Sequence, residues 1–236
     1  MLLQLDNIHT FYGWSHILFG VSLTLDRGEV VCLLGRNGAG KTTTFRSIIG
    51  LTPPSSGAIR FKDQIISGQD AYLIARKGIG YVPSGGRLFG GLTVLENLTV
   101  VARTGVGIAR GQVWTLDRIF DLFPVLKDRQ KQVANSLSGG QRQMVNIART
   151  LMSNPELLIL DEPSTGLSPL VVQRLGDHIL QLRDHGLSIL LAEQNAMFGM
   201  GLGERSYVLD KGEIRFAGTT KELRDNKELM HMYLAV

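Results

Sequence analysis

The sequence predicts an α/β fold in which helices cover a mostly parallel β-sheet. Short apolar runs alternate with amphipathic stretches along much of the chain. Strand, helix, strand in repeated order is typical of parallel sheets with helices on their faces. In two regions this rhythm changes, which indicates attachments to the sheet rather than further copies of the same unit.

The elements of this core follow from hydrophobic periodicity, taken in chain order. Apolar runs of strand length lie at 30–35, 157–161, 187–192 and 207–210. Helical spacing of apolar residues is found at 41–49, 141–153 and 171–183. Near the C-terminus, Lys211 and Gly212 separate two strand-like runs and predict a hairpin turn.

The two departures from the rhythm predict additional layers. Alternation of period two over 2–26 and 58–61 predicts a subdomain of antiparallel strands. The segments 94–98 and 116–125 look helical and have a glycine-rich stretch between them. We therefore expect an inserted helical lobe over approximately 84–150.

Composition places further limits on the class of protein. The chain of 236 residues is 44% hydrophobic and 19% charged, which excludes a disordered chain or a coiled coil. Its longest apolar runs have only a handful of residues, whereas a membrane-spanning helix needs roughly 20. No repeat and no low-complexity linker divides it, so we expect one domain over 1–236 that does not itself cross a bilayer.

The N-terminus and the single cysteine indicate a cytosolic protein. Residues 1–6 have no basic segment ahead of an apolar stretch, which a secretory signal requires. Cys32 has no second cysteine to pair with, which fits a reducing compartment. Because Cys32 lies within an apolar run, we expect a small buried side chain rather than a nucleophile.

The charges and histidines indicate neither a nucleic-acid partner nor a zinc site. The 25 lysines and arginines exceed the 21 acidic residues to give a net charge of +4, but they are scattered. The densest group, 127–131, is broken by an acid and is interpreted as a solvated helix end. The histidines, which lack the spacing of a zinc site, are His9, His16, His178, His185 and His231.

A glycine-rich segment after the first core strand matches the phosphate-binding pattern G-x-x-x-x-G-K-[ST]. Its residues are Gly35, Arg36, Asn37, Gly38, Ala39, Gly40, Lys41 and Thr42, with Thr43 next. Glycines let several backbone N–H groups point at one anion, and the following helix directs the positive end of its dipole at the same place. Lys41 adds a charge for the β- and γ-phosphates of a nucleotide, and the Thr42 hydroxyl is a ligand for Mg²⁺.

Two carboxylates end the apolar run at 157–161. Asp161 at the strand tip fits the role of holding Mg²⁺ through its water shell. Glu162 projects in a different direction and is free to polarise an attacking water as a general base. A solvated strand end is the simpler interpretation of an isolated Asp-Glu pair, but here a phosphate-binding loop is also present.

A second helix N-terminus is suited to an anion, because Ser138, Gly139, Gly140 and Gln141 open the predicted helix 141–153. With Leu137 they read LSGGQ, about 20 residues before Asp161. The phosphate-binding loop, LSGGQ and the Asp161–Glu162 pair follow one another in this order along the chain. By these three motifs the chain resembles the ATP-binding cassette (ABC) proteins. The resemblance implies a P-loop NTPase core of the ABC ATPase type that uses ATP and Mg²⁺. It also implies a dimer in which LSGGQ of one subunit closes over the γ-phosphate at the P-loop of the other.

The resemblance extends along nearly the whole chain. It places Tyr12 against adenine, and 164–168 at the loop that crosses the dimer seam. Ser84 falls where many members have a glutamine near the metal, which a serine reaches only through a water. Gln194 falls where most members have a histidine against the γ-phosphate. The implied catalytic residues are Lys41, Glu162 and Gln194, and the implied metal-site residues are Thr42, Asp161 and Ser84.

Glutamine at position 194 narrows the resemblance within the family. The runs 161–169 and 193–196 are similar to those in one of the two ATPase subunits of branched-chain amino-acid importers, although Ser84 stands where that subgroup often has glutamate. This implies a motor subunit at the cytoplasmic face of the inner membrane. Its implied partners are two integral-membrane permeases and a second ATPase subunit, or a copy of itself. Branched-chain amino acids, amides and urea remain open as cargo.

Three other classes compete with this interpretation. Soluble ABC ATPases of translation or DNA repair usually have two cassettes or long coiled-coil arms, for which 236 residues leave no room. LSGGQ has no role in P-loop GTPases or kinases, and the N-K-x-D guanine motif of GTPases is absent from the sequence. The motor of an ABC exporter, for lipid or lipopolysaccharide, stays open because only Gln194 argues against it.

Overall fold

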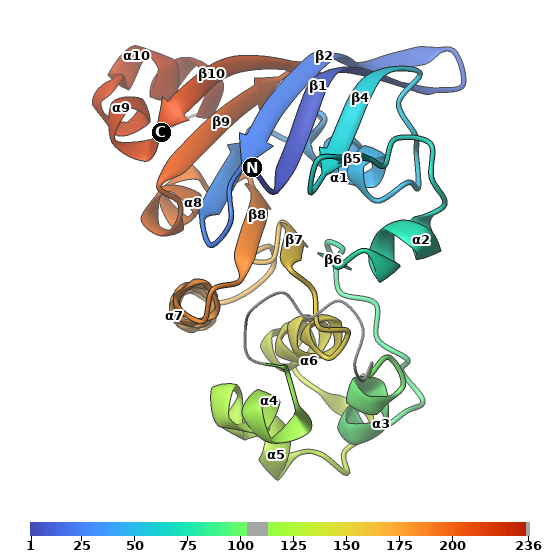
Figure 1. Ribbon diagram of the computed structural model, residues 1–236. Coiled ribbons are helices and arrows are strands. Elements are labelled where there is room, and N and C mark those ends of the chain that lie inside the picture. Colours follow the sequence, from blue (N-terminus) through green and yellow to red (C-terminus); the bar gives the residue numbers. More distant parts are fainter. Residues whose placement is uncertain (103–112, 235–236) are drawn as a thin grey trace.

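The computed structural model describes residues 1–102 and 113–234. Its central feature is a six-stranded sheet in the order β10-β9-β3-β8-β7-β6 (Figure 1). The strands are β3 Val30–Leu34, β6 Ile79–Val82, β7 Leu157–Asp161, β8 Ser188–Glu193, β9 Arg205–Asp210 and β10 Glu213–Thr219. Neighbours run parallel except for the edge pair β9 and β10, so the carboxyl ends of five strands meet at one edge of the sheet.

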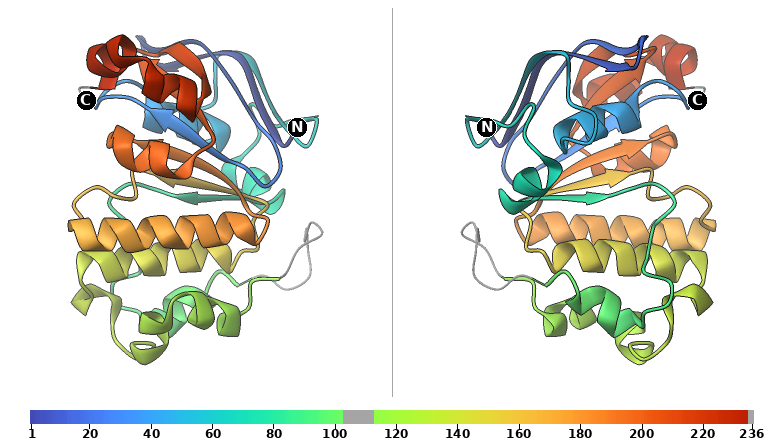
Figure 2. Two further views of the ribbon diagram at one scale, coloured as in Figure 1. Left: turned by 90° about the vertical axis from the view of Figure 1, so that its left-hand side faces the viewer. Right: turned by 90° about the vertical axis from the view of Figure 1, so that its right-hand side faces the viewer.

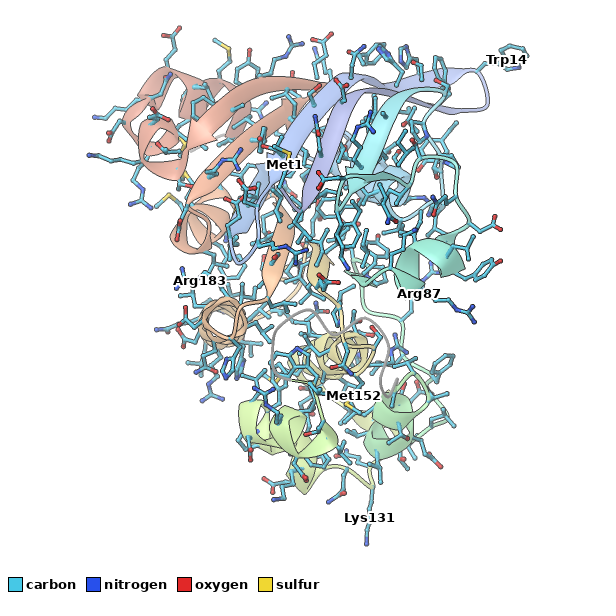
Figure 3. All side chains as sticks on the ribbon, in the orientation of Figure 1. Met1, Trp14, Arg87, Lys131, Met152 and Arg183 are labelled. Carbon is cyan, nitrogen blue, oxygen red and sulfur yellow. The ribbon has the colours of Figure 1, made fainter. Side chains whose placement is uncertain are left out.

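A second sheet lies over one face of the first and is antiparallel, in the order β2-β1-β4-β5. Its strands are β1 Leu3–Tyr12, β2 Ser15–Leu25, β4 Ser56–Phe61 and β5 Gln64–Ile65. The hairpin that joins β1 and β2 has Trp14 at its tip, where the side chain points away from the rest of the molecule (Figure 3). This sheet brings the end of β1 close to the loop after β3.

Helices complete the layers. α1 (Lys41–Ile48) packs between the two sheets. α6 (Gly139–Leu151) and α7 (Pro169–Asp184) lie side by side under the opposite face of the parallel sheet, with α3 (Val94–Thr99), α4 (Leu116–Leu122) and α5 (Pro124–Asp128) beyond them (Figure 2). The remaining helices are α2 Ala71–Arg76, α8 Ala196–Leu202, α9 Thr220–Asp225 and α10 Lys227–Leu229, with short helical turns at Ala134–Ser136 and Met230–Leu234.

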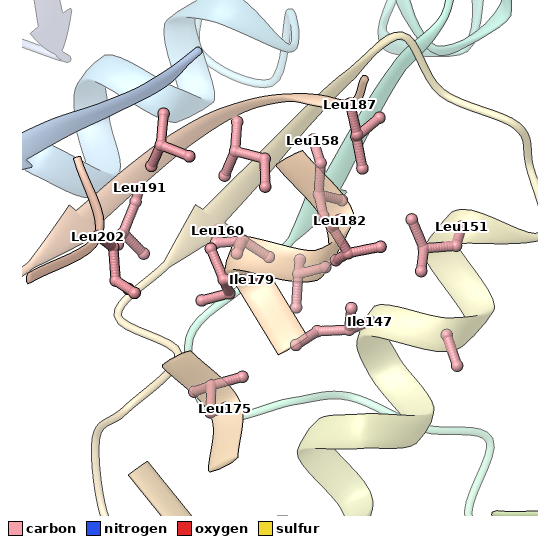
Figure 4. Close-up of a cluster of buried hydrophobic side chains, with 14 of the residues drawn as sticks. Ile147, Leu151, Leu158, Leu160, Leu175, Ile179, Leu182, Leu187, Leu191 and Leu202 are labelled. Carbon is pink, nitrogen blue, oxygen red and sulfur yellow. The ribbon is translucent and has the colours of Figure 1, made fainter. Parts of the chain in front are cut away.

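The strands of the parallel sheet are buried on both faces, and successive residues alternate between two hydrophobic cores. In β3, Cys32 and Leu34 belong to the core that includes α6 and α7, while Val31 and Leu33 belong to the core beneath the antiparallel sheet. Figure 4 shows part of the first core, with Leu158, Leu160 and Leu191 from the sheet and Ile147, Ile179 and Leu182 from the helices. Burial on both faces holds the strand ends in place, and these ends carry the candidate site.

The structure confirms the predicted α/β class, the mostly parallel sheet and the antiparallel strands. The single helix predicted at 116–125 is wrong, because α4 and α5 are separate helices with non-helical Phe123 between them. Pro124 explains the break, since proline disfavours the helical conformation in the preceding residue and has no N–H to donate. The glycine-rich stretch predicted in the lobe falls largely on 103–112, outside the described residues.

Several smaller predictions are also resolved. Cys32 is buried, and this burial is the main reason why the pKa of its thiol is raised to about 12. Lys211 and Gly212 have φ of +47° and +79° and form the predicted turn between β9 and β10. Lys131, from the basic group 127–131, is exposed at the end of the molecule away from the sheets (Figure 3). Within the described parts of the chain, no helix has the length and apolar character to cross a membrane.

Candidate functional site

The predicted phosphate-binding segment is the loop between β3 and α1, at the carboxyl edge of the parallel sheet. Its geometry requires glycine at two positions. A Cβ on Gly35 would lie 2.3 Å from the carbonyl oxygen of Leu209, and Gly40 has φ of +113°. The loop therefore passes close to β9 and turns directly into α1, so that the N-terminus of this eight-residue helix opens onto the inside of the loop.

Lys41 is a buried cation at the centre of this loop, with only 3% of its side chain exposed. Its Nζ donates hydrogen bonds to the carbonyl oxygens of Gly35 at 2.6 Å and Arg36 at 3.0 Å. The same Nζ forms an ion pair with Glu162 Oε1 at 3.0 Å. The backbone thus holds a positive charge inside the loop, where an anion gains most from it.

Half of the predicted nucleotide-binding residues, seven of fourteen, line one hollow of about 410 Å³. It is lined by Tyr12, Ile17, Asn37, Gly38, Gly40, Lys41, Thr42, Thr43 and Glu162. Tyr12 comes from the end of β1 and is 43% exposed, which leaves its ring accessible for stacking on a planar group. Gly35 and Ala39 are buried rather than part of the lining, and Arg36 is exposed. The hollow combines an aromatic face with a cationic loop, as a nucleotide requires.

Asp161 ends β7 and is 1% exposed. Its carboxylate accepts hydrogen bonds from Thr42 Oγ1 at 3.2 Å and from the Tyr81 hydroxyl at 3.0 Å. Burial is the main cause that raises the pKa of Asp161, and these two hydrogen bonds partly oppose it. A hydroxyl and a carboxylate oxygen this close are the hard ligands that Mg²⁺ prefers, so Thr42 and Asp161 fit a magnesium site.

This pair is not a metal cage by itself. Among the described residues, no three histidine, cysteine, aspartate or glutamate side chains are grouped to hold a metal ion. Mg²⁺ usually keeps several waters and is bound by one or two protein oxygens together with substrate phosphates. The donors at Thr42 and Asp161 therefore suit Mg²⁺ that arrives with a polyphosphate.

Glu162 lies on a sharp turn just after β7, with φ of +47°, a left-handed conformation that is rare for a residue with a side chain. Its backbone N–H donates to the carbonyl oxygen of Ala192 on β8 at 2.9 Å, which holds the turn in place. The carboxylate pairs with Lys41 through one oxygen and accepts a hydrogen bond from Thr165 Oγ1 at 3.4 Å through the other. The turn therefore directs Glu162 into the hollow, while Asp161 beside it stays buried against β6.

Ser138 begins α6 as its N-cap residue, and Gln141 completes a capping box with it. The next two residues, Gly139 and Gly140, lie in the first turn of the helix, and a Cβ on Gly140 would be 2.7 Å from Val171 of α7. Glycine there allows the two helices to approach closely. None of these four residues lines the hollow around Lys41, so the chain keeps its two predicted phosphate-binding helix ends apart.

Ser84 and Gln194 are both exposed, in the loops after β6 and β8. Neither residue lines the hollow, and Ser84 makes no hydrogen bond to Thr42 or Asp161 within the described chain. Both loops leave the same edge of the parallel sheet as the phosphate-binding loop. The fold thus places both residues at the edge that carries the phosphate-binding loop, without joining them to the other groups.

Sequence reasoning missed three residues at this site. Tyr81 binds Asp161 from β6, Ile17 lines the hollow from β2, and Glu193 accepts hydrogen bonds from Ser164. Glu193 directly follows the predicted strand 187–192, and Tyr81 lies near the end of β6, which was not predicted. A position near a strand end is only a weak signal for a site residue. The partners of Tyr81 and Glu193 follow only from the strand order β8-β7-β6, which the sequence does not specify.

Comparison with known proteins agrees with this geometry. The model of the ABC transporter family matches residues 18–165. The high-affinity branched-chain amino acid transport ATP-binding protein BraG of Pseudomonas aeruginosa is 41% identical over 234 residues, which cover 99% of each chain. The lipopolysaccharide export system ATP-binding protein LptB of Escherichia coli K12 is 36% identical, over 98% of this chain and 96% of that one. A nucleotide-free ATP-binding cassette from an ABC transporter superposes with a TM-score of 0.84 at 25% identity, over 100% and 98% of the chains.

Proposed function

This chain belongs to the ABC transporter family of ATP-binding, ATP-hydrolysing proteins, and on this premise we propose that it powers the import of branched-chain amino acids or related small solutes such as amides and urea. The observation that supports import best is the 41% identity to BraG along the whole of both chains. Glutamine at position 194 also supports it, by the resemblance to that subgroup. The cargo path would lie on two separate permease subunits, with this chain bound at the cytoplasmic face of the membrane.

In the proposed mechanism the adenine of ATP stacks on Tyr12, and the loop Gly35–Thr43 surrounds the phosphates. Lys41 then exchanges its contact with Glu162 for the β- and γ-phosphates. This releases the Glu162 carboxylate, which is positioned to accept a proton from the attacking water. Thr42 and Asp161 would hold Mg²⁺, which neutralises charge on the phosphates when bound.

The second helix end explains why the proposal includes a dimer. Ser138, Gly139, Gly140 and Gln141 lie at the start of α6 and do not line the hollow that holds Lys41. A helix end that does not line its own chain's hollow is available to a phosphate bound at Lys41 of another subunit. We infer that α6 of one subunit covers the γ-phosphate bound by its partner, which is a second ATPase subunit or a copy of this chain.

The loop after β6 is the proposed contact with a permease. Phe89 is 51% exposed, and the guanidinium of Arg149 lies 5.2 Å from its ring centre. Arg149 also donates a hydrogen bond to the carbonyl oxygen of Arg87 at 2.6 Å. Leu88, by contrast, packs against the protein's own core, so Phe89 and not Leu88 is the apolar side chain available to a partner. Because Arg149 belongs to α6, movement of this loop would be transmitted to the helix that begins at Ser138.

Export of lipid or lipopolysaccharide is a second candidate function, which the 36% identity to LptB supports. A transport assay distinguishes the two. The chain is reconstituted in liposomes with the two permeases and the second ATPase encoded beside it, and a binding protein is added outside. We expect ATP enclosed in the liposomes to drive uptake of labelled leucine above the level seen without ATP. ATP hydrolysis stimulated by lipopolysaccharide, without uptake of leucine, an amide or urea, would instead support export.

We also predict that this chain works best in a heterodimer. Glutamine can donate a hydrogen bond to a phosphate oxygen, but it does not carry the charge of a protonated imidazole or relay a proton. The purified chain alone should therefore hydrolyse ATP at least about tenfold more slowly than its mixture with the second ATPase, and Gln194→His should raise its own rate. Steady-state phosphate release measures the rate of ATP hydrolysis by the chain alone, by the mixture and by Gln194→His. Equal rates in the three samples would contradict the heterodimer and favour an active homodimer.

A further inference from the structure

One buried carboxylate near the site has no part in the mechanism described above. Glu193 is the last residue of β8 and is 1% exposed. Among the described residues Glu193 forms no ion pair, and the charge of Glu162 nearby is unfavourable. Burial is the main cause that raises the pKa of Glu193. Such a group is a poor source of stability, so its contacts need another explanation.

The contacts of Glu193 join two loops. Its Oε1 accepts a hydrogen bond from the backbone N–H of Ser164 at 3.1 Å, and its Oε2 accepts one from the Ser164 hydroxyl at 2.9 Å. The backbone N–H of Asn195 and the two bonds from Ser164 partly oppose the rise in the pKa of this carboxylate. Ser164 lies two residues after Glu162, and Asn195 directly follows Gln194. Glu193 itself directly precedes Gln194, so its side chain joins the start of that loop to the segment that follows Glu162.

The backbone around Glu193 strengthens this connection. The carbonyl oxygen of Glu193 accepts a hydrogen bond from the N–H of Gly35 at 3.3 Å, at the start of the phosphate-binding loop. The carbonyl oxygen of Ala192, one residue earlier, accepts the N–H of Glu162. The end of β8 is thus bonded to two segments, the phosphate-binding loop and the turn after β7, and the side chain of Glu193 holds the second of them.

We propose that Glu193 is a positioning residue for ATP hydrolysis, whose buried carboxylate locks the loop after Glu162 to the loop that carries Gln194. The two groups then approach the γ-phosphate as one unit. This inference rests on the proposed roles of Glu162 and Gln194. Glu193 itself does not line the nucleotide hollow, so it acts on hydrolysis only through its neighbours.

The substitution Glu193→Gln tests this role with little change of shape. An amide is uncharged and presents one acceptor oxygen in place of two, so the charge-assisted bonds are lost and the Ser164 hydroxyl has to turn to accept from the NH₂ group. We expect kcat for ATP hydrolysis to fall by about tenfold to a hundredfold, because small displacements of positioning groups have effects of this size. The KM and the equilibrium affinity for ATP should stay within about threefold of the parent chain, since the hollow around Lys41 is untouched.

Two further variants separate positioning from a structural role. Ser164→Ala removes one of the hydrogen bonds while the backbone bond remains, so we expect a smaller loss of kcat, and the double variant should lose less than the product of the two single effects. Glu156→Gln is the matched control. Glu156 is a carboxylate with 7% exposure at the other end of the sheet, paired with Arg27 and Lys62. The substitution Glu156→Gln should lower the midpoint of thermal unfolding and leave kcat for ATP hydrolysis unchanged.

The outcomes distinguish this inference from the proposed function. If the parent chain hydrolyses ATP and folded Glu193→Gln has the same kcat, or loses kcat and ATP affinity together, Glu193 is not a positioning residue. If Glu193→Gln does not fold, the kcat of Ser164→Ala decides in the same way. Absence of ATP hydrolysis by the parent chain, with and without the second ATPase, would contradict the proposed function instead.

Discussion

Replacing Glu162 with glutamine is expected to slow ATP turnover by at least about two orders of magnitude while ATP binding is retained. Glu162 lies on the edge of the hollow, and its carboxylate is the candidate acceptor for the proton of the attacking water. An amide of the same shape does not accept that proton. The exchange also removes the ion pair with Lys41, which keeps its bonds to the carbonyl oxygens of Gly35 and Arg36. ATP affinity should therefore be equal to or tighter than that of the parent chain.

Phosphate release measures the turnover of Glu162→Gln, and equilibrium titration with a fluorescent ATP analogue measures its affinity. Gel filtration with ATP and Mg²⁺ should show a trapped dimer, because the nucleotide is bound but not hydrolysed. Glu204→Gln is a suitable control, since the side chain of Glu204 is 73% exposed and does not line the hollow. A turnover number equal to that of the parent chain would remove Glu162 from the role of general base.

Replacing Lys41 with alanine should abolish function at an earlier step, by weakening ATP binding at least about 100-fold. Lys41 provides the buried positive charge inside the loop, and no other cation lines the hollow within the described chain. Alanine removes this charge and leaves Glu162 to repel the phosphates. Lys41→Arg should also bind weakly, because the larger planar guanidinium does not match a site shaped for a compact ammonium group.

The affinity of Lys41→Ala is compared with that of Lys131→Ala, which removes an exposed lysine far from the hollow (Figure 3). Thermal unfolding without nucleotide shows whether the loop still folds when the bonds from Lys41 to Gly35 and Arg36 are lost. A folded Lys41→Ala that binds ATP as tightly as the parent chain would show that the phosphate-binding loop has been assigned wrongly.

Each part of the site that residue patterns predict is a motif whose own residues are close together along the chain. The loop from Gly35 to Thr42 is contiguous, and its function depends on a local turn between a strand and a helix. The capping box at Ser138 and Gln141 is equally local. Tyr81 and Glu193 depend instead on which strands become neighbours in the sheet. Single-sequence periodicity identifies strands but not their order, so these contacts appear only in the structure.

The fold shows the same division between local and long-range information. Alternation of period two was sufficient to predict β1, β2 and β4 but not the two-residue β5, and buried apolar runs were sufficient for β3, β7 and β8. The short strand β6 was not predicted, because Gly80 and Tyr81 weaken the apolar signal of its four residues. The glycine is nevertheless required, since a Cβ there would lie 2.7 Å from Thr150 of α6. Packing against a distant helix, rather than local preference, determines this residue.

The strand order also constrains how the protein folds during synthesis. The neighbours of β3 in the sheet are β8 and β9, and about 150 residues separate the end of β3 from the start of β8. At synthesis rates of about 5–20 residues per second, roughly 8 to 30 s pass before the first neighbour of β3 is made. During this interval the apolar run Val30–Leu34 has no strand to pair with. The segment that later supports the phosphate-binding loop is therefore a natural target for chaperones on the ribosome, and the nucleotide site is completed only near the end of translation.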